Sequence, residues 1–206
     1  LGNHDLYLLR LMHMNQSTDD LKEVVEAANN KQIFEWLITR PLLIEISDQS
    51  TQNKFIITHA GIPEIWSPEK AKDLAEEVSI ALTDNTSKIL KTMWGDRPNS
   101  WNESLAGNDR HRIIINYLTR MRFLGNAASL DLKNTSINPS LGCKPWFRYK
   151  SESYKKMKQY YVFGHWASLN GQTNNPHFIG LDTGCVWEGS LTALRVDNLE
   201  KISVQY

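Results

Sequence analysis

The chain has 206 residues, enough for one large core or two small domains, and its 41% hydrophobic and 22% charged residues are the balance of an ordinary globular protein. Lysine plus arginine number 23, as do aspartate plus glutamate, so the formal net charge is zero. A neutral chain lacks the overall field that attracts DNA or an anionic membrane, so any anion must be recognised locally.

The cysteines and the apolar stretches argue against a disulfide-rich protein and against a membrane-spanning one. Cys143 and Cys185 lie far apart and are too few for a disulfide framework, so we expect two free thiols. No stretch approaches the roughly 18 apolar residues of a membrane span, and we expect a cytoplasmic protein without a membrane partner. The chain opens on Leu1 rather than Met, and residues 2–5 already carry chemistry, which predicts a truncated N-terminus.

The first part of the chain is predicted to be mainly helical. Apolar residues recur at helical spacing over residues 6–14, 21–28 and 33–37, and Pro41 ends the last of these helices. The apolar residues 42–46 that follow predict a strand.

The middle of the chain alternates between strand, helix and loop. Residues 55–57 form a short apolar run that predicts a buried strand, and residues 69–82 predict a helix. Glycine, proline, asparagine and serine make residues 94–108 a loop. Residues 110–121 are predicted to be helical, and the polar, turn-rich residues 126–145 are predicted to form an insertion or a lid.

The last part of the chain predicts short strands. Residues 160–163 are an apolar run that ends at Gly164-His165, and residues 177–181, 191–196 and 201–204 complete the strands. Mixed strands and helices, with chemistry-bearing loops at strand ends, indicate an α/β or α+β fold.

Three short motifs combine metal-capable side chains with glycine: Gly2-Asn3-His4-Asp5, His59-Ala60-Gly61 and Gly164-His165-Trp166. Two of them directly follow an apolar strand, which would hold the imidazole on a rigid element. Asparagine and histidine suit divalent ions such as Mn²⁺, Fe²⁺, Co²⁺ or Zn²⁺. A single histidine at a strand end is more often a hydrogen-bonded structural residue, so the prediction depends on all three motifs together.

The order of these motifs resembles that of the calcineurin-like metallophosphoesterases, in their phosphoprotein-phosphatase branch. Five further segments narrow the resemblance to the bacterial symmetrical diadenosine tetraphosphate hydrolases, over residues 1–196. These segments are Met93-Trp94-Gly95-Asp96-Arg97-Pro98, Thr119-Arg120-Met121-Arg122-Phe123, Lys144-Pro145-Trp146-Phe147, Phe163-Gly164-His165-Trp166-Ala167 and Leu181-Asp182-Thr183-Gly184-Cys185.

The resemblance implies a fold and an activity. Residues 1–206 would be the C-terminal part of a single α/β (α+β) domain, in which two mixed sheets lie face to face between flanking helices. The intact enzyme would use two divalent ions, of Mn, Co, Mg or Fe/Zn type, to split diadenosine tetraphosphate into two ADP. Dinucleoside polyphosphates, including such caps on RNA ends, would be the partners, and DNA would not be one.

The resemblance also implies residue roles. Asn3, His59 and His165 would ligate one metal, and His4 would be the general acid beside the leaving oxygen. Imidazole suits that role because it titrates near pH ~6.5. Asp5 would orient His4, or would only be an acid in the first turn of the helix that follows.

Arginines are the expected phosphate ligands, because guanidinium binds phosphate oxygens in a bidentate manner. We favour Arg110, with Arg120 and Arg122 as further candidates, and the alternative for each is a structural salt bridge. Arg112 would point to a different helix face from Arg110. Asp96 is expected to hold a loop or an arginine near the metals.

Four tryptophans lie in the family-like segments and could stack on adenine: Trp94, Trp146, Trp166 and Trp187. Trp166 is the favoured one because it follows a predicted ligand, and the alternative for each is core packing. Glu188 stands where the family usually has glycine, and its carboxylate would repel a polyphosphate unless it faces solvent.

The sequence also departs from the family pattern. Two motifs, Gly-Asp-x-His-Gly and Gly-Asp followed by Arg-Gly, would supply the other metal ligands, and neither is present. We therefore expect an incomplete core and little or no activity from this chain. A protein phosphatase and a non-catalytic, nucleotide-binding remnant remain as alternative functions.

Overall fold

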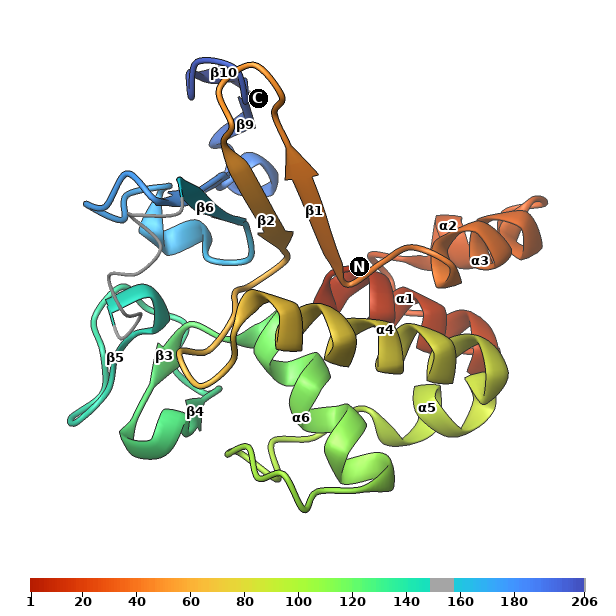
Figure 1. The fold of residues 1–206 in the computed structure, drawn as a ribbon. Coiled ribbons are helices and arrows are strands. Elements are labelled where there is room, and N and C mark those ends of the chain that lie inside the picture. Colours follow the sequence, from red (N-terminus) through yellow and green to blue (C-terminus); the bar gives the residue numbers. More distant parts are fainter. Residues whose placement is uncertain (149–157, 206) are drawn as a thin grey trace.

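The fold is taken from a computed structural model, which describes residues 1–148 and 158–205 (Figure 1). Its α-helices are α1 (Asn3–Met14), α2 (Lys22–Val25), α3 (Asn30–Ile38), α4 (Pro68–Asp84), α5 (Thr86–Thr92) and α6 (Gly107–Arg120).

Most of the helices follow the predictions. The start of α4 shows why: Ser67 caps it by accepting a hydrogen bond from the Lys70 amide at 3.2 Å, and Pro68 occupies the first turn. Helix α6 begins three residues before the predicted start. The prediction started late because Gly107 and Asn108 are residue types that favour turns. Helix α5 was not predicted, and its threonines and short length explain the weak signal.

The strands form a four-stranded mixed sheet and two small antiparallel sheets in the described residues. The mixed sheet has the order β1 (Leu43–Ser47), β2 (Lys54–Thr58), β6 (Gln159–Phe163) and β7 (Phe178–Gly180). The second contains β10 (Lys201–Gln205), β9 (Ser190–Leu194) and β8 (Asp182–Thr183), and the third contains β4 (Leu130–Asp131), β3 (Phe123–Leu124) and β5 (Lys144–Pro145).

The direction of pairing in the mixed sheet matters for function. Strand β1 is antiparallel to β2, whereas β2 and β6 are parallel, with Ile57 opposite Val162. Parallel neighbours end at the same edge of a sheet. The segments that follow β2 and β6 therefore emerge side by side, although about a hundred residues of chain separate them.

Alternate residues of the mixed sheet face two different layers. Ile56 and Phe163 belong to the main core, which also includes the inner faces of α1, α4 and α6. Phe55 and Val162 face the other way and pack with Leu194 of the β8–β10 sheet. The mixed α/β class is confirmed, but of the two facing sheets that were expected to be mixed, the one containing β9 is antiparallel.

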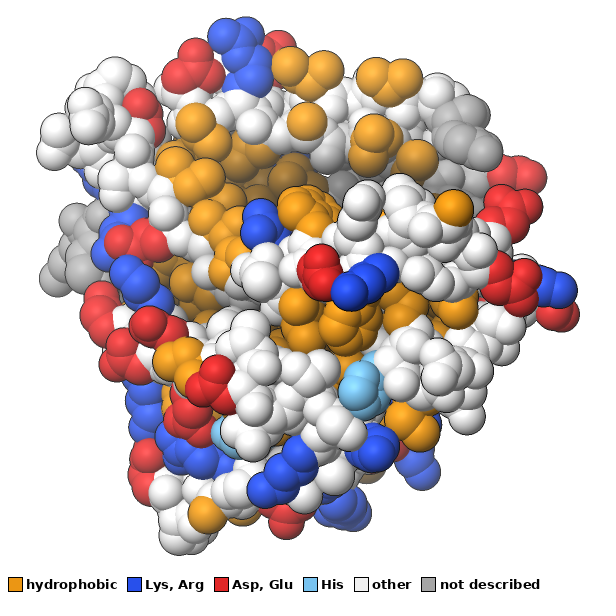
Figure 2. Space-filling view, turned by 90° about the vertical axis from the view of Figure 1, so that its right-hand side faces the viewer, with side chains coloured by type: hydrophobic (Ala, Val, Ile, Leu, Met, Phe, Trp, Pro, Cys, Tyr) orange, Lys and Arg blue, Asp and Glu red, His pale blue; other side chains and the backbone are white. Residues whose placement is uncertain are grey.

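One face of the molecule is apolar at the edge formed by β1. Ile44 and Ile46 on this strand are 45% and 40% exposed. Figure 2 shows hydrophobic side chains gathered around a hollow on this face, which Ile44, Ile57 and Leu181 line. His59 lines both this hollow and the larger pocket described below.

Two predictions about chain class can be compared with the structure. Cys143 and Cys185 are both free thiols, as expected. Among the described residues, no helix combines the length and the apolar character needed to cross a bilayer.

Candidate active site

The three motifs predicted from the sequence meet at one place, between the N-terminus of α1 and the ends of β2 and β6. His59 follows β2 and His165 follows β6, and the Gly164 amide donates a hydrogen bond to the His59 carbonyl at 2.9 Å. Gly2 allows α1 to approach, because a Cβ at this position would lie 2.6 Å from Nδ1 of His59. Only glycine therefore permits this contact.

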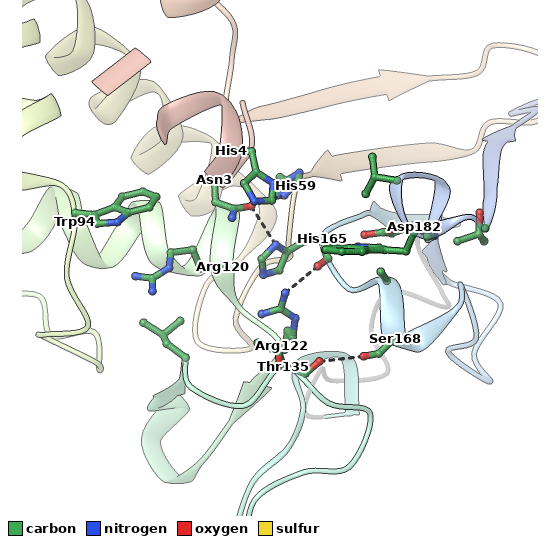
Figure 3. A pocket seen from close by; sticks show the side chains of 17 residues that line it. Asn3, His4, His59, Trp94, Arg120, Arg122, Thr135, His165, Ser168 and Asp182 are labelled. Atoms are coloured by element: carbon green, nitrogen blue, oxygen red, sulfur yellow. Dashed lines mark hydrogen bonds between the residues drawn. The ribbon is translucent and has the colours of Figure 1, made fainter. Parts of the chain in front are cut away.

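The donor atoms of Asn3, His59 and His165 converge (Figure 3). Asn3 Oδ1 lies 2.8 Å from His59 Nε2 and 3.2 Å from His165 Nδ1. Ligands at about 2.1 Å from an octahedral cation are separated by about 3.0 Å along an edge. Both distances are close to that spacing, so Asn3 Oδ1 and each imidazole nitrogen could be neighbouring ligands on one ion.

The two imidazoles are held in the neutral form that a metal requires. Burial lowers the pKa of His59 to about 4, against a smaller opposing effect of the Asp5 carboxylate. Burial also lowers the pKa of His165 strongly, and the nearby Arg122 guanidinium and His59 act in the same direction. Nε2 of His165 is buried and has no hydrogen-bond partner among the described residues.

This donor set fits part of a metal site. One amide oxygen and two neutral imidazoles suit a borderline divalent ion. The described residues contain no group of three or more His, Cys, Asp or Glu side chains that could hold a metal. The described residues therefore present three candidate ligands for one ion, without a carboxylate among them.

The two residues predicted to be catalytic occupy different positions. His4 is the second residue of α1, is exposed, and lines the same pocket as the three candidate ligands. Asp5 Oδ2 accepts a hydrogen bond from the Gly2 amide at 2.7 Å, at the start of α1, where a carboxylate also interacts favourably with the helix dipole. This contact is the helix-start role that was one of the two expected for Asp5.

The pocket has a volume of about 860 Å³. Its lining comes from α1, the loops after β2 and β6, the Trp94 and Thr135 segments, the end of α6, and the β8–β9 turn. The segment 126–145, predicted as an insertion or lid, packs against the pocket, since Ser168 Oγ donates to the Thr135 carbonyl at 3.1 Å.

Two of the three candidate arginines reach the pocket. Arg120 and Arg122 both line it, at the C-terminal end of α6 and just beyond. Arg122 Nη2 donates to the His165 carbonyl at 3.0 Å, at a residue whose φ of 63° is left-handed. Burial lowers the pKa of Arg122, and Asp182 partly compensates.

The prediction for Arg110 was wrong. Its Nε and Nη2 donate to the two carboxylate oxygens of Glu77 at 2.7 and 2.8 Å, and its guanidinium lies over Trp101. Arg110 does not line the pocket, because it lies almost three turns from Arg120 on the same helix. The alternative of a structural salt bridge is the one observed.

Asp96 has the position expected of a residue that holds an arginine. Its Oδ1 accepts a hydrogen bond from Arg120 Nη2 at 3.0 Å. Arg120 Nη1 in turn donates to Asn116 Oδ1 at 3.0 Å, and the guanidinium lies 5.5 Å from the centroid of the Trp94 ring. Three neighbours thus fix the direction of Arg120.

The tryptophan preference was also wrong. Trp166 is 2% exposed and packs edge-on against Phe123, so it is a core residue. Trp146 is fully buried as well. Trp94 and Trp187, at 37% and 77% exposed, are the tryptophans that line the pocket.

Sequence reasoning missed Asn116, which is fully buried and contacts Arg120. The available signal was a polar residue within the predicted inner face of the helix at 110–121. Glu188 is exposed, does not line the pocket and has a left-handed φ of 62°, a conformation that glycine adopts without strain.

Comparison with known proteins supports the assignment from the motifs. No family model matches the chain. Proteins named symmetrical bis(5'-nucleosyl)-tetraphosphatase are 42% identical over 209 residues in Marinomonas sp. (98% of this chain, 74% of the relative) and 41% over 207 residues in Pseudomonas putida (97% and 70%). The protein of that name from Legionella pneumophila is 38% identical over 211 residues, which are 99% of this chain and 74% of the relative.

The fold is similar to that of a solved structure described as a "putative diadenosine tetraphosphatase", with a TM-score of 0.58 and 21% identity. The comparison covers 100% of this chain and 66% of that one. At this identity the likeness concerns the fold alone. The sequence identities with the curated relatives are much higher and extend over nearly the whole chain, and they show that the chain belongs to the family of symmetrical bis(5'-nucleosyl)-tetraphosphatases.

Proposed function

We propose that this chain carries the metal-binding and phosphate-binding part of an enzyme that hydrolyses diadenosine tetraphosphate symmetrically to two ADP. The observation that supports this most strongly is the convergence of Asn3 Oδ1, His59 Nε2 and His165 Nδ1 in a pocket that also contains two arginines. The curated relatives carry the corresponding name.

The proposed reaction is hydrolysis of the central phosphoanhydride bond. The oxygen of a water molecule bonds to one of the two central phosphorus atoms, and the bridging oxygen leaves on the other ADP. A divalent cation held by Asn3, His59 and His165 would supply Lewis-acid stabilisation of phosphate charge and activate the water. The family resemblance implies two such ions, of Mn, Co, Mg or Fe/Zn type.

His4 is proposed to donate a proton to the leaving oxygen. It is exposed at the pocket, directly after the ligand Asn3, and it stands in the first turn of α1. The partial positive charge of this helix end favours an anion there. A tetraphosphate carries about four negative charges, which Arg120 and Arg122 would contact from the other side of the pocket.

Complete metal coordination needs ligands in addition to these three. We therefore propose, as the sequence indicated, that residues 1–206 form the C-terminal part of a single metallophosphoesterase domain and that carboxylates outside this chain complete the site. Dinucleoside polyphosphate caps on RNA ends are proposed as further substrates, and the cytoplasm as the location.

The test compares residues 1–206 with a chain extended upstream to the start of its reading frame. Each is incubated with diadenosine tetraphosphate and Mn²⁺ or Co²⁺, and the products are separated by anion-exchange chromatography. We expect the extended chain to yield only ADP, and its His4→Ala and His59→Ala variants to lose at least ~100-fold in rate. Products of unequal length, such as ATP plus AMP, would contradict the proposal.

A further inference from the structure

The β8–β9 turn places a large aromatic ring at the pocket. Trp187 ends the short helical turn Cys185–Trp187 and is 77% exposed, yet it is one of the residues that line the pocket with His59, His165 and Arg122. An indole can bury 150–250 Å² of surface, so a ring left this open offers considerable contact area to a flat ligand.

The backbone of this turn is fixed by local contacts. The amides of Trp187 and Gly189 both donate to the Gly184 carbonyl, at 2.8 and 2.9 Å. The Gly184 amide in turn donates to Asp182 Oδ1 at 3.1 Å. A Cβ at Gly189 would lie 2.2 Å from the Thr183 carbonyl oxygen, which shows how tightly the turn is closed. Trp187 is therefore presented from a well-defined backbone rather than from an open loop.

Trp187 differs from most other exposed apolar residues and from Trp94, while Val186, which is 84% exposed and also lines the pocket, has no aromatic face. Ile44, Leu191 and Val204 are also exposed, but they do not line this pocket. Trp94 lines the pocket, but its ring already stacks on the Tyr7 ring, with 6.0 Å between the centroids, and the Arg120 guanidinium lies over it. In the described part of the chain, the Trp187 ring makes no such ring or cation contact.

We propose that Trp187 is a stacking platform for a nucleobase of the bound dinucleotide, a subsite that rests on the proposed function. The arginines of the pocket suit phosphate and the histidine–asparagine cluster suits a divalent cation, whereas the exposed face of Trp187 suits the apolar face of a purine. Such a platform recognises the base by its π-face, and a base–aromatic stack contributes about 1–3 kcal/mol. It would thus select nucleotides over plain polyphosphates.

The test measures binding of two probes by calorimetry in the presence of Mn²⁺: ADP, which has a base, and inorganic tripolyphosphate, which has none. The Trp187→Ala change should weaken ADP binding roughly 5- to 150-fold, the range that 1–3 kcal/mol represents, and leave tripolyphosphate binding within about twofold. Trp187→Phe keeps an aromatic face and should recover most of the lost affinity.

The matched control is Trp36→Ala, because Trp36 is similarly exposed, at 59%, but lies on α3 and is not part of this pocket. This change should leave the affinity for both probes unaltered. The proposal is overturned if Trp187→Ala leaves ADP binding unchanged, weakens both probes equally, or if the unmodified chain prefers tripolyphosphate to ADP.

These outcomes are separate from those of the hydrolysis assay. If the chain binds ADP in a Trp187-dependent manner and the extended chain makes no ADP, the platform is supported and the proposed reaction is wrong. If the extended chain makes two ADP and its KM is unaffected by Trp187→Ala, the reaction is supported and the platform is wrong.

Discussion

Replacing Asn116 by alanine should loosen Arg120 and thereby weaken phosphate binding. Asn116 is fully buried on the inner side of α6. Its Nδ2 donates to the Gly95 carbonyl at 2.9 Å, and its Oδ1 accepts from Arg120 Nη1 at 3.0 Å. One side chain therefore joins the loop that carries Trp94 and Asp96 to the arginine that lines the pocket.

The expected magnitude follows from the two bonds lost. The neutral bond to Gly95 contributes about 1 kcal/mol, and the bond to the Arg120 guanidinium about 1.5–3 kcal/mol before discounting. Arg120 keeps its Asp96 partner, and the Gly95 carbonyl also accepts from Arg120 Nη1 at 3.3 Å, so the full sum is not lost. We expect the free energy of unfolding to fall by about 2 kcal/mol, and tripolyphosphate affinity to fall roughly 3- to 10-fold as Arg120 becomes less well oriented.

Urea unfolding and calorimetric titration with tripolyphosphate measure the two effects. Thr119→Val is the matched control, because Thr119 is equally buried on α6, and within residues 1–148 and 158–205 its hydroxyl bonds only to the Ile115 carbonyl of its own helix. This control should alter stability modestly and leave affinity unchanged. If Asn116→Ala destabilises the protein but binds tripolyphosphate as the unmodified chain does, the reasoning about Arg120 is refuted.

Three further substitutions or conditions give defined outcomes. Arg110→Ala should reduce the free energy of unfolding in urea by about 1 kcal/mol, through loss of the half-buried pair with Glu77, without changing tripolyphosphate affinity; a tenfold loss of affinity would return Arg110 to the site. Gly2→Ala should displace the His59 ring and lower Mn²⁺ affinity in calorimetry at least ~10-fold, because the new Cβ would lie 2.6 Å from that ring; unchanged affinity would show that the ring has room to move. The pKa of His59 is lowered to about 4, so the imidazole of the unfolded chain binds a proton at a higher pH than that of the folded chain. The contribution of His59 to the free energy of unfolding is therefore fully present above pH ~6.5 and should decline by up to about 3 kcal/mol towards pH ~4. Thermal unfolding from pH 7 to 4.5 checks this, and His59→Gln should show a smaller decline.

The convergence of Asn3, His59 and His165 could be predicted because its signal is local. An apolar run ending at Thr58-His59, and another ending at Gly164-His165, each identify a strand and the side chain that follows it. The parallel pairing of β2 and β6 then brings the two imidazoles together, with ring centroids 5.2 Å apart. Only the direction of pairing had to be supplied by the fold.

The predictions for Arg110 and Trp166 failed for two different reasons. Arg110 forms an ion pair with Glu77, which is 33 residues earlier in the sequence, and no local sequence pattern indicates that pairing. Trp166 adjoins a predicted ligand, but its neighbour His165 has a left-handed backbone. The chain turns there, so the indole enters the core while the imidazole faces Asn3.

The two arginines near the pocket have different relations to the metal ligands. Arg120 is oriented by Asp96, Asn116 and Trp94, none of which is a predicted ligand, and its side chain is 22% exposed. Arg122 instead donates to the carbonyl of His165, at the residue with left-handed φ, so it stabilises the backbone that directs a ligand into the cluster. A phosphate that draws Arg122 towards itself would also alter His165, and by linkage an ion bound at His165 would alter phosphate affinity by the same factor. We therefore expect a change at Arg120 to affect phosphate binding alone, and a change at Arg122 to affect phosphate binding and metal binding together.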